Sequence, residues 1–123
     1  MQMLADSSEE GVLPGLGWLP GSVQTLAGDS MNESLPLPHM GWNELQIKTQ
    51  QNLFPSTISE SPQFYFLHSY YFRAKNQSDV IATTNYGFDF DAVVFNGNVF
   101  GMQCHPEKSH IWGEHFLRAF TEL

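Results

Sequence analysis

The sequence feature that most constrains the fold is the pair Asn96-Gly97, which lies between two apolar stretches. Such a pair is typical of a tight β-hairpin, because both central residues of a type I′ turn need a positive φ. The pattern predicts one strand over residues 92–95 and a second over residues 98–104, with Asn96 and Gly97 at the centre of the turn. The second strand ends directly before His105, so the hairpin places this histidine at a strand end.

A terminal helix is predicted after the hairpin. Ser109 is a suitable N-cap, and Gly113 inside the helix costs about 1 kcal/mol relative to alanine. Because glycine is present despite this cost, we expect the helix backbone at Gly113 to lie too close to another segment for a side chain to fit. The apolar face of the helix, at helical spacing, is formed by Trp112, Phe116, Phe120 and Leu123.

β-propensity and alternation predict further strands upstream. The most aromatic run, residues 63–72, is predicted to be one strand because of its length and composition. In the segment 44–48, Leu45 and Ile47 are expected to share one face of a half-buried strand. The other short strands are expected over residues 23–26 and 80–84.

The segments between these strands are expected to be irregular. Residues 1–5 are interpreted as the end of a helix, because no cap or turn precedes them. Loops and turns are expected over residues 7–21, 28–34 and 50–62, the last with one helical turn around Leu53 and Phe54.

Composition limits the classes of partner. With 41% hydrophobic residues among 123, the chain can bury an ordinary core, and it is interpreted as one domain or part of one. The net charge of −8 and only five lysines and arginines argue against nucleic acid and anionic membranes, because no basic patch can form. A single cysteine fits a reducing compartment, and neither a signal peptide nor an apolar run of membrane-spanning length is found. We therefore expect a cytoplasmic protein that binds small solutes or other proteins.

His105 and Glu107 form the most specific chemical pattern. Pro106 fixes its own φ at about −65° and favours an extended His105, so the flanking side chains should project to the same side. A carboxylate that holds one ring nitrogen sets the tautomer and direction of an imidazole, which a general base serving a nucleophile needs. The spacing alone also leaves open a solvated turn with an acid at the head of a helix.

Cys104 adjoins His105 and is the first candidate for a nucleophile. Adjacent residues of a strand face opposite sides of a sheet, so the two side chains should diverge. Cys104 is therefore expected to be a small buried residue.

The other histidines do not predict a metal site. His110 and His115 are five residues apart rather than the four that align ligands on one helical face, and no further ligand stands at suitable spacing. His39 and His68 lie in proline-bounded or aromatic segments, where a structural histidine with satisfied hydrogen bonds is the usual outcome. We expect no metal.

Several segments together resemble one enzyme family. Residues 101–109, GMQCHPEKS, resemble the signature G-x-Q-F-H-P-E-K-S of class I glutamine amidotransferases, and the lysine and serine narrow the resemblance to the amidotransferase subunit of imidazole glycerol phosphate synthase. Residues 38–43, PHMGWN, match the P-H-M-G-W-N of that subfamily, and residues 64–71, FYFLHSYY, are similar to its F-Y-F-V-H-S-Y-Y. The resemblance covers essentially the whole chain. It implies an α/β, flavodoxin-like domain with a mixed central sheet, of which this is the C-terminal portion.

The first residues also resemble the family. Gln2 stands in the position of the last residue of the nucleophile elbow, G-x-C-x-G-M-Q, so residues 1–123 are expected to begin just after the nucleophile cysteine. The chain alone is then expected to be inactive. Cys104 stands where the family usually has phenylalanine, which agrees with a packing role.

The resemblance implies hydrolysis of glutamine without a cofactor. A cysteine thiolate attacks the side-chain amide, a thioester forms, ammonia leaves, and water regenerates the enzyme. His105 would deprotonate the thiol and then protonate the leaving ammonia, and Glu107 would orient His105. The residues implied to hold L-glutamine are Gln2, His68, Ser69 and Tyr70.

The resemblance also implies a protein partner. Trp42 and Lys108 correspond to positions near the interface with a (β/α)8-barrel cyclase subunit, which receives the ammonia in histidine biosynthesis. An alternative is a paralogous amidotransferase that supplies ammonia for amino sugars of surface polysaccharides. This alternative is favoured by residues 82–87, ATTNYG, and by His110. A third hypothesis is a non-catalytic remnant that only binds a partner, which predicts no cysteine elbow upstream.

Overall fold

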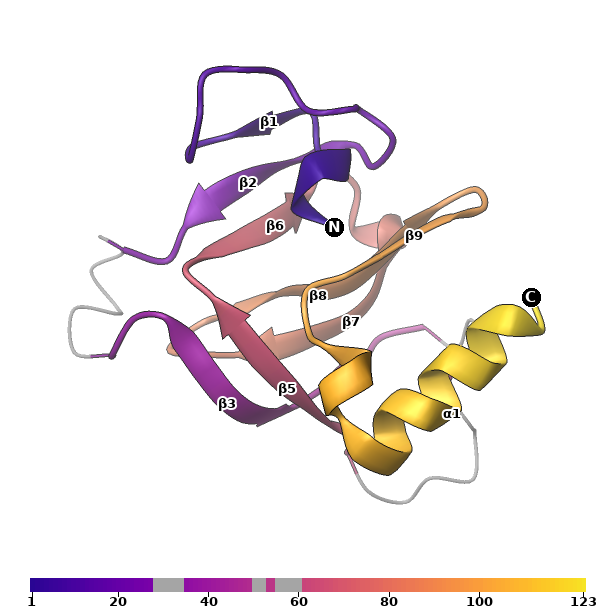
Figure 1. Cartoon of the computed structure of the whole chain (residues 1–123). Coiled ribbons are helices and arrows are strands. Elements are labelled where there is room, and N and C mark those ends of the chain that lie inside the picture. The colour runs from indigo at the N-terminus through magenta and orange to yellow at the C-terminus, as the bar shows by residue number, and fades with distance from the viewer. Residues whose placement is uncertain (28–34, 50–52, 55–60) are drawn as a thin grey trace.

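The computed structural model describes residues 1–27, 35–49, 53–54 and 61–123 (Figure 1). The turn expected over residues 28–34 and most of the segment 50–62 lie outside the described residues. Within the described part, the chain forms a seven-stranded sheet, a two-stranded sheet and the helix α1 (His110–Thr121). No helix among the described residues is long and apolar enough to cross a membrane.

The seven-stranded sheet has the order β1-β2-β6-β8-β7-β4, with β9 also paired to β8. Strands β1 and β2 run parallel and the other neighbours run antiparallel. The mixed sheet expected from the family resemblance is therefore confirmed. The strands are β1 (Ser7–Ser8), β2 (Gly21–Thr25), β4 (Gln46–Ile47), β6 (Tyr70–Ala74), β7 (Val80–Asn85), β8 (Asp89–Asn96) and β9 (Val99–Met102).

The two-stranded sheet pairs β3 (His39–Glu44) with β5 (Gln63–His68) antiparallel. Its strands alternate between buried and more accessible side chains, as expected when one face packs on a core and the other faces outwards. Three short 3₁₀ helices complete the described elements: Gln2–Leu4, Gln77–Asp79 and Pro106–Lys108. The first lies where the end of a helix was expected.

Residues 63–72 are β-strand as predicted, but they form two strands rather than one. The chain leaves the smaller sheet after His68, and β6 pairs with β2 in the larger one, so Ser69 separates two strands. A second change of sheet occurs at Leu45, between β3 and β4. Leu45 is buried there whereas Ile47 is 37% exposed, so the expectation that these two share one face of a half-buried strand is wrong.

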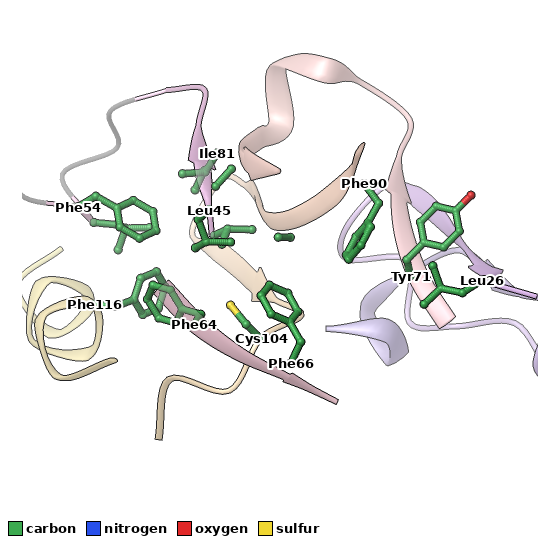
Figure 2. Close-up of a cluster of buried hydrophobic side chains, with 14 residues drawn as sticks. Leu26, Leu45, Phe54, Phe64, Phe66, Tyr71, Ile81, Phe90, Cys104 and Phe116 are labelled. Carbon is green, nitrogen blue, oxygen red and sulfur yellow. The ribbon is translucent and has the colours of Figure 1, made fainter. Parts of the chain in front are cut away.

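Adjacent residues of the central strands belong to two different apolar clusters. On β8, Val93 packs in one cluster and Val94 in the other, and Tyr71 and Phe72 divide in the same way on β6. This follows from the alternation of side chains across a strand. The larger cluster includes Phe54, Phe64, Phe66 and Phe116 and is drawn in Figure 2. It joins the two sheets to α1.

The hairpin and terminal helix are confirmed, with two adjustments. Asn96 pairs with Val99, so Gly97 and Asn98 are the central turn residues, one position later than predicted. Gly97 has a φ of 60° and Asn98 has no positive φ, as a type II′ turn with glycine first requires. On the predicted apolar face of α1, Phe116 is buried, whereas Phe120 near the end of the helix is exposed.

Candidate active site

His105 and Glu107 lie within hydrogen-bond distance across Pro106. Nδ1 of His105 is 2.8 Å from Oε1 of Glu107, and His105 has extended backbone angles, φ −102° and ψ 92°. The hydrogen bond from His105 lowers the pKa of the Glu107 carboxyl below its ordinary value. Because the carboxylate takes Nδ1, Nε2 is the ring nitrogen left for a proton transfer.

The backbone around His105 is tied to β5. The amide N–H of His105 donates to the carbonyl of Tyr65 at 2.9 Å, which makes an isolated bridge between these residues. The hydroxyl of Ser109 donates to the carbonyl of His105 and accepts from the amide of Tyr65 at 3.0 Å. Ser109 precedes α1 as predicted, but its side chain does not cap the helix because it is engaged in these two bonds. Its position fixes the turn that carries the imidazole.

Cys104 belongs to the larger apolar cluster. Its side chain is 4% exposed, and Figure 2 shows its sulfur beside the ring of Phe66. Burial raises the pKa of the Cys104 thiol well above its ordinary value. The buried packing role predicted for this residue is confirmed, and a thiol in this environment is a poor nucleophile.

An open groove of about 870 Å³ lies beside the imidazole. It runs between the first residues, the crossing from β5 to β6, and the end of the hairpin. The groove brings together five of the predicted site residues: Gln2, His68, Ser69, Tyr70 and His105. Glu107 lies behind His105, outside the lining of this groove.

Gln2 connects two walls of the groove. Its Nε2 donates to the carbonyl of Tyr70 at 2.9 Å and to Oε1 of Gln103 at 3.3 Å. Sequence reasoning did not single out Gln103, although it lies in the same GMQCHPEKS segment as His105. Its place two residues before His105 in that segment was the signal available.

His39 and His68 form a buried pair that spacing did not predict. Nδ1 of His39 lies 2.8 Å from Nε2 of His68. Residue His39 is 3% exposed and residue His68 is 7% exposed. The pKa of each histidine is lowered to about 4, mainly because the ring is buried. The expectation of satisfied structural histidines is met, in that each ring nitrogen has a partner.

Trp42 and Lys108 lie outside the groove, near the accessible face of the β3–β5 sheet. The Trp42 ring centroid is 6.1 Å from that of Tyr65, and Nζ of Lys108 is 5.7 Å from the Tyr65 centroid. Trp42 also contacts the ring of His110. Met40 and Leu67, which face each other in the register of this sheet, are also exposed.

The described residues hold no group of three or more histidine, cysteine, aspartate or glutamate side chains placed to bind a metal ion. His110 contacts Trp42, and His115 lies on α1 with Nδ1 buried and without a partner among the described residues.

The chain is similar to known proteins over nearly its whole length. The family model for "Glutamine amidotransferase class-I" matches residues 1–122. Proteins named imidazole glycerol phosphate synthase subunit HisH are similar to the chain, at 46% identity over 123 residues in Bdellovibrio bacteriovorus and in Leptospira borgpetersenii. A protein of Pseudomonas aeruginosa named imidazole glycerol phosphate synthase subunit HisH 2 is 44% identical over 123 residues.

These matches cover nearly all of this chain but not of the relatives. The alignment includes 100% of the chain and 60% of the Bdellovibrio and Leptospira proteins, and 99% of the chain and 58% of the Pseudomonas protein. The chain therefore spans about 60% of the length of the curated relatives that it matches.

Proposed function

The chain belongs to the class I glutamine amidotransferases, and from that premise we propose that its protein hydrolyses L-glutamine and delivers the ammonia to a partner subunit. The proposed setting is the formation of imidazole glycerol phosphate in histidine biosynthesis. The names of the similar proteins support it.

The observation that carries the proposal is the 2.8 Å hydrogen bond between His105 and Glu107 at the edge of an open groove. An imidazole held by a carboxylate at Nδ1 presents Nε2 as a base of fixed direction. The groove beside it has room for a small substrate. The two features together support acyl transfer on a small amide.

The proposed reaction uses one base for two proton transfers. His105 takes the proton of a cysteine thiol, and the thiolate attacks the carbonyl carbon of the glutamine side chain. The imidazolium returns that proton to the departing nitrogen, so ammonia leaves and a thioester remains. A water molecule, deprotonated by the same imidazole, then hydrolyses the thioester to glutamate and restores the thiol. The carboxylate of Glu107 stabilises the imidazolium in each half of the reaction.

The nucleophile of this reaction is not Cys104. That thiol is buried among apolar side chains, and it is the single cysteine of the 123 residues. The proposal therefore requires a cysteine from outside these residues, placed beside Gln2 and within reach of Nε2 of His105.

The substrate would lie in the groove lined by Gln2 and by the segment from His68 to Tyr70. This segment supplies polar backbone and side-chain groups on one wall, and the imidazole of His105 lies on the other. No cofactor enters the proposed reaction.

The partner in the proposal is a (β/α)8-barrel cyclase subunit, which forms a heterodimer with this protein. It would contact the accessible face of the β3–β5 sheet at Trp42 and Lys108, which lie close to the turn that carries His105. Exposed aromatic side chains such as that of Trp42 are enriched in protein interfaces. A cytoplasmic location is part of the proposal, since a single cysteine in these residues fits a reducing compartment.

Ammonia release from glutamine by the full-length protein, assembled with the barrel subunit, tests the proposal. His105→Gln should reduce the rate by at least about 10²-fold, since general base catalysis contributes that much or more. His115→Gln, on the outer helix, should leave the rate unchanged. An assembled wild-type protein without ammonia release would contradict the proposal and favour the non-catalytic remnant. Activity that depends on a sugar-modifying synthase in place of the cyclase would favour the surface-polysaccharide paralogue.

A further inference from the structure

Behind the groove, two buried histidines form a continuous chain of hydrogen bonds. His39 on β3 and His68 at the end of β5 face each other in the register of the two-stranded sheet and bond through Nδ1 and Nε2 at 2.8 Å. The other nitrogen of each ring is also engaged. Nδ1 of His68 lies 2.8 Å from the carbonyl oxygen of Tyr70, and Nε2 of His39 lies 3.2 Å from Nδ2 of Asn43.

The partners at the two ends fix the order of protons along this chain. A carbonyl oxygen can only accept, so Nδ1 of His68 carries a proton. In a neutral ring, Nε2 of His68 must then accept from Nδ1–H of His39, and Nε2 of His39 accepts from the amide of Asn43. The second proton of that amide goes to the carbonyl of Asn85 at 2.8 Å. Burial, which lowers the pKa of both histidines to about 4, agrees with two neutral rings at neutral pH.

The His68 end of this chain of hydrogen bonds lies in the wall of the groove. The carbonyl of Tyr70 that accepts from His68 also accepts from Nε2 of Gln2 at 2.9 Å. Gln2, His68 and Tyr70 line the groove, whereas His39 lies behind it. The buried ring of His68 therefore fixes the position of the Tyr70 carbonyl. That carbonyl in turn holds the side chain of Gln2 by a hydrogen bond.

We infer that His39 and His68 are positioning residues for glutamine binding, which act by holding the Tyr70 carbonyl and, through it, the side chain of Gln2. This role rests on the proposed glutaminase function. It assigns a task to His39, which does not reach the groove. It also gives His68 an indirect task, because both of its ring nitrogens are engaged within the protein and not turned to a substrate.

Packing and hydrogen bonding at His39 can be separated by two substitutions. The His39 ring stacks on Phe66 and Tyr86, with centroids 4.8 Å and 4.1 Å apart. His39→Phe keeps a ring in these stacks but removes the N–H that points to His68. His39→Asn keeps an N–H donor near the position of Nδ1 but removes the ring.

The steady-state kinetics of glutamine hydrolysis by the full-length protein with its partner subunit provide the first test. His39→Phe should raise KM for glutamine about tenfold, with kcat within about twofold of wild type, because one hydrogen bond that fixes the binding wall is lost. His39→Asn should keep KM near the wild-type value, as should the control His115→Gln. A raised KM in His39→Asn with a normal KM in His39→Phe would overturn the inference in favour of packing.

A second test does not use activity. In the ¹⁵N NMR spectrum of the ¹⁵N-histidine-labelled full-length protein at pH 7, both His39 and His68 should be neutral with the proton on Nδ1. An Nε2–H tautomer on either ring would overturn the proton order and the inference. An active wild type whose KM is unchanged in His39→Phe would overturn the inference alone, whereas an inactive wild type would overturn the proposed function as well.

Discussion

A Cβ atom built on Gly113 would lie 1.8 Å from the carbonyl oxygen of Pro106. The first turns of α1 are therefore packed backbone to backbone against the turn that carries His105 and Glu107. The glycine that costs helix stability is required by this contact, as the sequence predicted. The helix therefore supports this turn by direct backbone contact.

Gly113→Ala should destabilise the protein although alanine is the better helix former. The added methyl group must displace backbone atoms, which costs about 1–3 kcal/mol in a packed site and exceeds the gain of about 1 kcal/mol in helix propensity. Urea unfolding measures this change, and the displaced turn should also lower kcat. The control is Gly11→Ala, because a Cβ at Gly11 meets nothing within 4 Å. Equal stability of the two variants would contradict the close contact.

Ser109→Ala should lower both stability and activity. It removes the hydroxyl that accepts from the amide of Tyr65, whereas the carbonyl of His105 still accepts from the amide of Lys108. A buried polar group without a partner costs about 1–3 kcal/mol. The matched control is Ser78→Ala, since Ser78 is exposed and bonds only to a neighbouring aspartate among the described residues. The free energy of unfolding and kcat measured for both variants decide the matter, and an unaffected Ser109→Ala would show that the bridge does not hold the turn.

Glu107→Gln should lower kcat with little change in KM. The neutral amide can still lie beside Nδ1, but it stabilises the imidazolium less than a carboxylate does, which we expect to cost about 10²-fold. Glu114→Gln removes an equally exposed acid whose ion pair is with Arg118 on α1, and it should retain full activity. A Glu107→Gln variant with normal kcat would remove Glu107 from the proposed machinery.

The buried histidine pair should make the protein less stable as the pH falls below about 6.5. The pKa of His39 and His68 is lowered from 6.5 to about 4 in the folded state, so between these values the unfolded chain binds more protons than the folded one. The free energy of unfolding is then full above pH 6.5 and declines towards pH 4, by on the order of 3 kcal/mol for one such histidine. Urea titrations of the full-length protein at several pH values measure the slope. His39→Phe should flatten it, and an unchanged slope in that variant would contradict the assignment.

Cys104 should resist alkylation in the folded protein. Its thiol is buried and its pKa is raised by desolvation, so little thiolate is present and reagents have no access. Peptide mapping by mass spectrometry after iodoacetamide treatment should show Cys104 unmodified under native conditions and modified in urea. Rapid labelling of the native protein at Cys104 would contradict the packing described here.

The local features of the fold were predictable from the sequence. The hairpin, the terminal helix, the contact at Gly113 and the burial of Cys104 each depend on a few consecutive residues whose conformational limits are strong. The convergence of His105 and Glu107 was predictable for the same reason, since Pro106 restricts the backbone between them. The exact turn residues were not, because Gly97 satisfies more than one hairpin type.

The features that depend on distant residues were not predictable by the same reasoning. Residues 63–72 have continuous β-propensity, and only the pairing of β5 with β3 and of β6 with β2 divides them at Ser69. His39 and His68 are 29 residues apart, so no spacing rule brings them together. The groove is likewise formed by segments from both ends of the chain. Its residues were assigned to one site only by the family resemblance.

The bridge between Tyr65 and His105 joins the amide of a residue that follows β9 to a carbonyl of the smaller sheet. The smaller sheet also carries Trp42, on the face proposed to receive the partner. This bridge and the Ser109 hydroxyl together tie the smaller sheet to the turn that carries the imidazole. In the proposed complex, a partner that shifts β5 would therefore also shift the imidazole of His105.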